Sequence, residues 1–217
     1  MKRLLLAILI LIQFPVLSQS LDGKFQLGGS ASYFTNNSEY ESGSGIDYRN
    51  QIIERTNFSI TPQFGYFISD NISIGGQIGY SRASFLNYYE SGQNTMSDYN
   101  RKDNTFRFGT FTRVHKSIKE NLYLFLQGNI EVGFGKIRYE ESQNNDLNSF
   151  DFHAGIQPGI LFMITEKFGI EGKYGLLGYN SSKTSSDDPN ENVSDVSQRF
   201  GLDFNPGSFA LGLQFYL

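Results

Sequence analysis

Apolar and polar side chains alternate along this chain, and this period of two constrains the fold more than any other feature of the sequence. Around residue 60, for example, Phe58, Ile60 and Phe64 share one parity, with Ser59 and Thr61 between them. Successive side chains of a β-strand point to opposite faces, so the pattern predicts strands that each carry one apolar face. Such segments number about eight: 24–34, 56–68, 72–84, 104–114, 122–138, 150–163, 168–179 and 198–217.

The connections between these segments alternate in length. Three are short and four are long and polar: 69–71, 115–121 and 164–167, against 35–55, 85–103, 139–149 and 180–197. Short turns on one side and long loops on the other are typical of bacterial outer-membrane barrels. With both ends of the domain on the short-turn side, the number of strands must be even. The pattern therefore predicts an all-β fold: an eight-stranded antiparallel transmembrane up-and-down β-barrel with short periplasmic turns and long extracellular loops.

A soluble β-sandwich also alternates, and it is the competing fold. In a sandwich, the Phe, Ile and Leu residues found on nearly every segment would share one thick core. The opposite parity carries glycine, small polar residues and charged residues: Lys24, Arg107, Arg113, Glu131, Asp151, Glu171 and Lys173. These charges balance closely enough in sign to pair inside a narrow lumen. Lipid outside and a paired polar interior account for both parities, and a closed barrel leaves no open backbone edge in lipid.

The first residues have the three parts of a secretory signal. Lys2 and Arg3 precede the apolar run 4–12, Pro15 follows it, and small serine residues come next. The apolar run is shorter than the roughly 20 residues that a spanning helix needs, although an uncleaved membrane anchor is the alternative. We therefore expect a signal peptide over 1–18, or cleavage two residues later, and a barrel domain over 19–217 that is exported to the outer membrane.

The composition argues against several classes of function. The 20 Phe, 13 Tyr and 23 Gly residues favour strands and tight turns over helices. A formal net charge of −4 offers no cationic surface for nucleic acid. The absence of cysteine excludes disulfides, thiolate metal sites and a lipoprotein anchor. The densest acidic run, 187–191, lacks the spacing of a calcium loop, so neither a metal nor a cofactor is expected.

A near-repeat within the chain supports the strand register. Aligning Pro62 with Pro158 brings residues 68–74 onto 164–170, which are strand, turn and strand in both copies. These units, the signal peptide and the alternating aromatic segment 209–217 resemble the small OmpA/OmpX-like outer-membrane β-barrel family common in Bacteroidetes. The resemblance covers nearly the whole mature chain and implies insertion by the barrel-assembly machinery, which reads an aromatic last strand. Leu217 stands where the family usually has Phe, and the wall-tethering role of longer relatives is not expected.

Histidine is the first place to look for catalysis. His153 and Asp151 share the inward parity of the sixth segment, whereas His115 belongs to a predicted turn. Small outer-membrane lipid A deacylases and acyltransferases use a His with a Ser and an acid at the rim, so a lipid A-modifying enzyme is the alternative function. The deacylases carry His-x-Ser, however, and here Ala154 and Gly155 follow His153. We expect His153 to belong to a hydrogen-bond network in the lumen.

An eight-stranded barrel is only wide enough for side chains to fill its interior. The inward charges are therefore predicted to form a plug of ion pairs, and a small low-conductance pore is the third alternative. The predicted lumen charge network consists of Lys24, Arg107, Arg113, Glu131, Asp151, His153, Glu171 and Lys173.

The sequence therefore predicts a non-enzymatic outer-membrane barrel with a structural or surface-interaction role. We expect a monomer surrounded by outer-membrane lipid. The long polar loops offer a contact surface for an extracellular partner, because tyrosine combines apolar area with a polar tip. The tyrosines of the first two loops are Tyr40, Tyr48, Tyr88, Tyr89 and Tyr99.

Overall fold

The computed structural model describes residues 21–42, 49–91, 94–139, 146–186, 194–204 and 206–217. The predicted signal peptide, the acidic run 187–191 and Tyr48 lie outside these residues. The described chain forms one antiparallel sheet and a 3₁₀-helix, η2 (Pro206–Ser208). The strands are β1 (Phe25–Ser42), β2 (Arg49–Ser69), β3 (Ile72–Ser91), β4 (Asn94–Lys119), β5 (Leu122–Tyr139), β6 (Leu147–Met163), β7 (Phe168–Lys173), β8 (Leu176–Ser186), β9 (Ser194–Asp203) and β10 (Ala210–Tyr216). Among the described residues, no helix is both long and apolar enough to cross a membrane.

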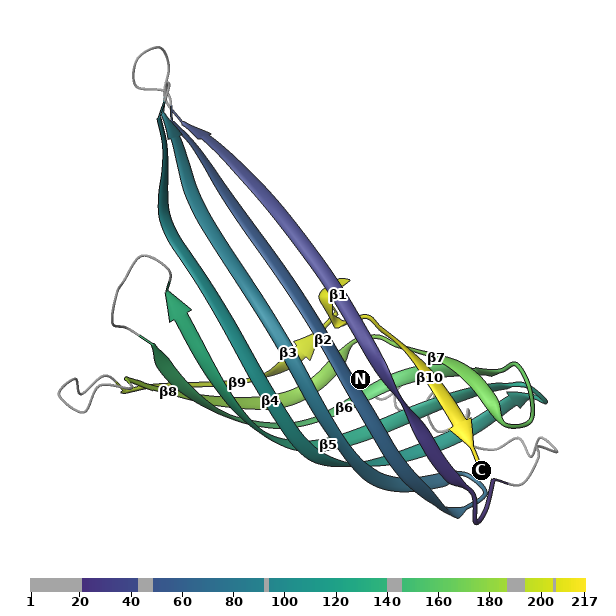
Figure 1. Ribbon diagram of the computed structural model, residues 1–217. Helices are drawn as coiled ribbons and strands as arrows, with labels where there is room; N and C mark the ends of the chain where they lie inside the picture. Colours follow the sequence, from purple (N-terminus) through teal and green to yellow (C-terminus); the bar gives the residue numbers. More distant parts are fainter. Residues whose placement is uncertain (1–20, 43–48, 92–93, 140–145, 187–193, 205) are drawn as a thin grey trace, which may run out of the picture.

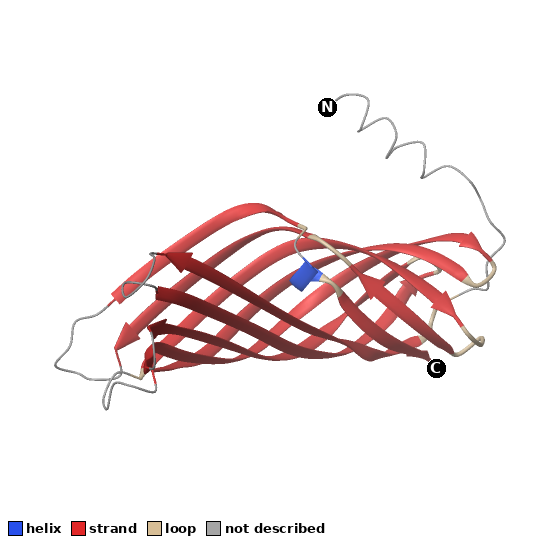
Figure 2. Ribbon diagram, turned by 90° about the horizontal axis from the view of Figure 1, so that it is seen from above, coloured by secondary structure: helices blue, strands red, loops and turns tan. Residues whose placement is uncertain are grey.

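The sheet closes on itself. Each strand from β1 to β6 pairs with the next one along the chain. From β6 the ring continues through β7 and β10, and β10 returns to β1. The strands run strongly tilted around a common axis (Figures 1 and 2). The prediction of an all-β antiparallel fold is confirmed.

The described residues form ten strands rather than eight, so the predicted strand number is not confirmed. The seventh and eighth predicted segments, 168–179 and 198–217, are each divided in two. Lys173 pairs with Ala210, and Leu176 pairs with Asp203. Two residues on one strand, 174 and 175, therefore face six on the other, 204–209. Regular strand pairing cannot accommodate so many extra residues on one strand. The longer segment therefore leaves the sheet and forms η2.

Four residues hold this excursion in place. Gly175 has a φ of +78°, and its N–H donates to Ser208 Oγ at 3.2 Å. The Tyr174 and Phe204 rings lie 5.9 Å apart, and the Tyr174 hydroxyl donates to the Phe204 carbonyl oxygen. Beyond the excursion, β9 pairs with β8 and does not reach β1. We call the gap between β9 and the part of β1 beyond Ala31 the seam (Figure 1).

Most residues predicted to be long loops are strand instead. The predicted loops 35–55 and 85–103 lie largely within β1 to β4, including Tyr40 and Tyr88. Above Phe58, the outward side chains of β2 become polar, as at Thr56 and Glu54, although the backbone ladder continues. Alternation of hydropathy reports burial or lipid contact rather than strand pairing, so it ends before the strands do. The predicted turn 115–121 is present but shorter for the same reason, because β4 continues to Lys119 and β5 begins at Leu122.

Replacing Gly175 tests whether this residue stabilises the excursion. Gly175→Ala should lower the free energy of unfolding by about 1 to 2 kcal/mol through its left-handed backbone alone. A Cβ at this position would also collide with the Phe204 ring. Gly201→Ala is the matched control on β9, because the nearest atom to its new Cβ is 3.9 Å away. Urea unfolding of both variants measures the difference, and equal stabilities would contradict the role assigned to Gly175.

Candidate functional site

Burial in the ring is the reverse of that in a soluble protein. Side chains facing the interior at mid-height are polar and at most 6% exposed: Gln26, Gln63, Gln77, Arg113, Gln127, Glu171, Lys173 and Gln214. Their neighbours on the same strands are apolar and exposed: Leu27, Phe64, Ile78, Val114, Leu126, Ile170 and Leu213. Exposed apolar side chains covering nearly every strand are far more extensive than the patches that soluble monomers carry.

An ion cluster crosses the middle of the ring. Arg113 on β4 binds Glu171 on β7, with 2.6 Å between Nη1 and Oε2. Lys173 Nζ lies 3.6 Å from the other oxygen of Glu171. β4 and β7 are not neighbours in the sheet, so the Arg113–Glu171 bond spans the interior rather than a strand pair. A guanidinium and a carboxylate matched in this way form one of the strongest polar contacts available to side chains.

Buried amide side chains surround this cluster and form hydrogen bonds with Arg113 and with one another. Arg113 donates to Gln63 Oε1 at 3.1 Å and to Gln127 Oε1 at 2.9 Å. Gln26 donates to Gln214 at 3.0 Å, and Gln63 donates to Gln77 at 2.6 Å. The predicted lumen network contained charged residues and His153, and these amides were not included in it. They share the inward parity of the charges, so the same parity count, extended to Gln, would have found them.

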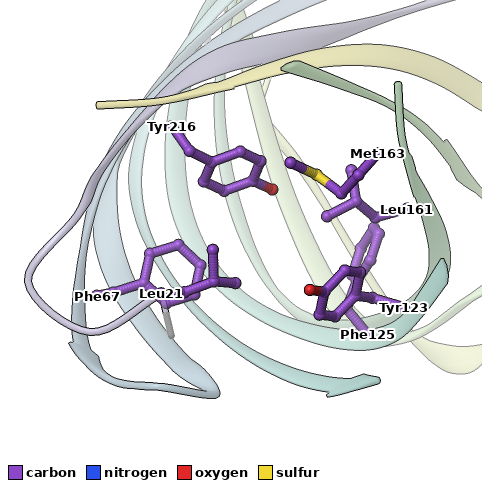
Figure 3. Packing of buried hydrophobic residues seen from close by; sticks show 7 residues of the cluster. All are labelled: Leu21, Phe67, Tyr123, Phe125, Leu161, Met163 and Tyr216. Carbon is purple, nitrogen blue, oxygen red and sulfur yellow. The ribbon is translucent and has the colours of Figure 1, made fainter. Parts of the chain in front are cut away.

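An apolar cluster closes the ring at its short-turn end. Its members come from strand ends on both sides of the ring, and Figure 3 shows their side chains gathered inside the sheet: Leu21, Phe67, Tyr123, Phe125, Leu161, Met163 and Tyr216. The Phe125 ring lies against Gly159, where a Cβ would leave no room for it. His115 lies between Phe67 and Phe125, with ring centroids 5.1 and 5.9 Å away. Together, this apolar cap and the ion cluster fill the lower interior.

Beyond the ion cluster, the interior widens into a cavity of about 790 Å³. Its wall is mostly polar and includes Ser30, Asn129, Arg101, Arg107, Asp151 and His153. Arg107 donates to Ser81 Oγ at 2.9 Å and lies 3.9 Å from Asp151. Arg101 is bound to Asp103 through two contacts of 2.7 Å. The cavity is thus a hydrophilic vestibule above the ion cluster.

The predicted network residues fall into separate groups. Arg113, Glu171 and Lys173 form the ion cluster. Glu131 accepts a hydrogen bond from Gln77 beside the cluster, and Arg107 and Asp151 face each other in the cavity. Lys24 is half-buried in the turn before β1 and makes no ion pair with any described residue.

The arrangement around His153 bears on the enzyme alternative. His153 Nδ1 lies 2.6 Å from Asn180 Oδ1, while the carboxylate of Asp151 is directed to Arg107. The imidazole is therefore oriented by an amide from β8 rather than by the predicted acid. Within the residues that the structure describes, no group of three or more His, Cys, Asp or Glu is placed to hold a metal ion.

Among known proteins, the chain is similar only distantly to solved structures. No protein-family model and no curated protein matches the sequence. The crystal structure of Neisserial surface protein A superposes with a TM-score of 0.46 and 13% sequence identity, covering 89% of this chain and 99% of that one. A likeness this distant supports no inference about the present chain. Membership of the OmpA/OmpX-like family stays a prediction.

Removing the central carboxylate tests the importance of the ion cluster. Glu171→Ala leaves Arg113 and Lys173 buried without their counter-ion, and should lower the free energy of unfolding by about 3 to 5 kcal/mol. Asp103→Ala breaks the more exposed Arg101–Asp103 pair and should cost about 1 kcal/mol or less. Urea unfolding followed by circular dichroism measures both. Losses of similar size would contradict a buried ion cluster.

Proposed function

We propose that this chain is an outer-membrane β-barrel with a structural or surface-interaction role. In this proposal β7 with β8, and β9 with β10, each count as one crossing, which gives eight crossings of the lipid. The reversed burial carries the proposal: a polar interior such as Gln63, Arg113 and Glu171 lies inside an exterior of Phe, Ile and Leu. Apolar atoms gain by facing acyl chains, whereas the same surface in water would drive aggregation.

Two aromatic belts support a membrane position. The upper belt follows six strands and consists of Tyr33, Phe58, Tyr80, Phe106, Phe134 and Phe150. Its rings touch across strands, with centroids 5.0 Å apart for Tyr80 and Phe106. Near the short turns, Phe25 lies 5.2 Å from Tyr66, and Phe168 lies 4.7 Å from Phe215. Aromatic girdles of this kind mark both interfaces of outer-membrane barrels.

The spacing of the belts suits an outer membrane. On β2, Phe58 and Tyr66 belong to opposite belts, so the segment that joins the two interfaces is nine residues long with both ends included. A tilted transmembrane strand needs roughly 9 to 11 residues. The outward residues just above the belt are charged, as at Arg82, Lys136 and Lys183, which suits a head-group region.

The strands continue well beyond the upper belt. β1 to β4 extend as a paired sheet whose two faces are largely polar (Figure 1). A rigid polar sheet above the membrane can present a surface to other molecules without covalent chemistry. We therefore propose a surface role for this extension and no catalytic centre in the barrel.

A charged substitution on the lipid face tests the membrane position. Ile130 faces outward in the apolar band and is 58% exposed. Ile130→Arg should cost roughly 2 to 4 kcal/mol in lipid vesicles, because a charge near the mid-plane loses its hydration. Asn104→Arg, above the upper belt, is the control and should cost about 1 kcal/mol or less. If Ile130→Arg proves neutral, Ile130 faces water and the membrane proposal fails.

We propose that the ion cluster and the apolar cap close the lumen, so the barrel does not conduct ions. Purified protein in a planar bilayer should show no discrete conductance steps, because the ion cluster and the apolar cap both fill the interior. The double variant Arg113→Ala, Phe125→Ala removes one large side chain from each layer and should conduct, with folding checked by heat-modifiable gel migration. Regular steps from the unaltered protein would favour the pore alternative instead.

A further inference from the structure

The seam leaves two strand edges open in the upper half of the ring. β1 pairs with β10 only from Gln26 to Ala31, and beyond Ala31 it pairs with β2 alone among the described residues. β9 pairs with β8 alone. The excursion at 204–209 creates this gap, and the contacts of Gly175 and Tyr174 hold it open. The seam is therefore a property of the fold rather than a frayed strand end.

Large apolar side chains flank the seam on its outer side. Tyr33 on β1 is 69% exposed, and Phe200 on β9 is 74% exposed. Leu202 and Phe204 continue the apolar surface along the same edge. Under the proposed membrane position, this rim faces acyl chains. An acyl chain can thus lie against the rim without crossing a polar barrier.

The same seam opens on its inner side into the cavity. Ser32, Phe34 and Asn36 of β1 line the cavity from one edge of the seam. Residues 207–210 and Leu176 line it from the other edge. The lining at the seam includes Phe34, Leu176 and Phe209, while the opposite wall is polar. A molecule lying across the seam would meet apolar side chains at one end and hydrophilic ones at the other.

The polar wall includes a cation, Arg55, that is paired with no carboxylate of the described residues. Arg55 on β2 lines the cavity, stacks over the Phe85 ring at 5.2 Å and makes no ion pair with any described residue. A side pocket of about 460 Å³ brings Arg55 together with Arg101 and Asp103. Arg55 is thus a cation of this pocket that makes no ion pair among the described residues. An anionic group would complete the pairing.

We propose that the seam and cavity form a binding site for a single-chain amphiphile with an anionic head group. The head group binds Arg55 and Arg101 in the cavity, and the acyl chain passes through the seam to the apolar rim. The ligand enters sideways from the outer leaflet, because the ion cluster and the apolar cap lie below. This inference rests on the proposed membrane position.

A tryptophan reporter tests the site, since the chain has no native tryptophan. Phe34→Trp, refolded into phosphatidylcholine vesicles, is titrated with an alkyl phosphate whose chain carries bromine, a contact quencher of indole fluorescence. We expect quenching that saturates, with half-quenching at a concentration at least about tenfold below that of the matching alkyl trimethylammonium. Equal curves for the two head groups would overturn an anionic site.

Substitutions of basic residues test which side chain contacts the head group. In the Phe34→Trp background, Arg55→Ala should raise the half-quenching concentration about tenfold, the usual effect of losing one charge-assisted hydrogen bond. Lys183→Ala removes an exposed cation of β8 outside the cavity and should leave the curve unchanged. An Arg55→Ala curve that coincides with its parent would remove the proposed contact.

Bridging the seam tests the sideways route. Asn36→Cys with Gly207→Cys, joined by a short bismaleimide, spans the seam, and the bridge should abolish quenching of Trp at position 34. Thr35→Cys with Thr56→Cys, whose exposed hydroxyls lie 3.5 Å apart, places the same bridge between β1 and β2, outside the cavity, as a control. Unaltered quenching after bridging the seam would refute lateral access. Covalent dimers of Phe34→Cys on a non-reducing gel would instead assign the seam to a second copy of the chain.

A second tryptophan reporter distinguishes an error in the proposed binding site from an error in the proposed membrane position. Phe64→Trp places the reporter on the outward face of β2. Brominated phosphatidylcholine should quench it strongly wherever the band contacts lipid. Quenching at position 64 without saturable quenching at position 34 overturns the binding site alone. No quenching at position 64 overturns both.

Discussion

An apolar exterior surrounds a buried polar interior in this protein, and most polar groups of that interior must therefore bond to one another. The closed ring of strands meets this requirement for most of the backbone, because β10 returns to β1 and leaves no edge at that level. The same requirement shapes the interior, where Arg113 is matched by Glu171 and by the amides of Gln63 and Gln127. Removing any partner leaves another group desolvated, so the interior is cohesive although it contains little apolar core.

Much of this arrangement could be predicted from the sequence. Alternation around Phe58 and Phe64 predicted which face of each strand is apolar, and the inward charges Arg113, Glu171 and Lys173 come together across the ring. Strand ends were predicted poorly, because backbone pairing continues where outward residues turn polar. Parity tells which side of a sheet a residue occupies, but it does not tell which opposite strand supplies its partner. Glu171 therefore could be placed inside, and its bond to Arg113 could not be foreseen.

Little in the sequence indicates that the predicted segments 168–179 and 198–217 are each divided into two strands. The apolar residues are even-numbered up to Phe204 and odd-numbered from Phe209, with Pro206 and Ser208 at the interruption, and the alternation is likewise interrupted at Gly175 on the preceding strand. Each interruption alone is compatible with an ordinary bulge. Only the pairing of Lys173 with Ala210 and of Leu176 with Asp203 reveals that their lengths differ. The seam arises from this mismatch, and a mismatch between two strands cannot be read from either strand alone.

The return of β10 to β1 has a consequence for the order of assembly. Gln26 and Gln214, which bond across this pair, are 188 residues apart in the chain. Contacts so distant form late, because a long stretch of chain must first lose its freedom. Hairpins such as β2 with β3 involve close neighbours and can form early. Until the final strand docks, β1 carries an unsatisfied edge along its whole length, so the half-built sheet is exposed to aggregation and needs a protected route to closure.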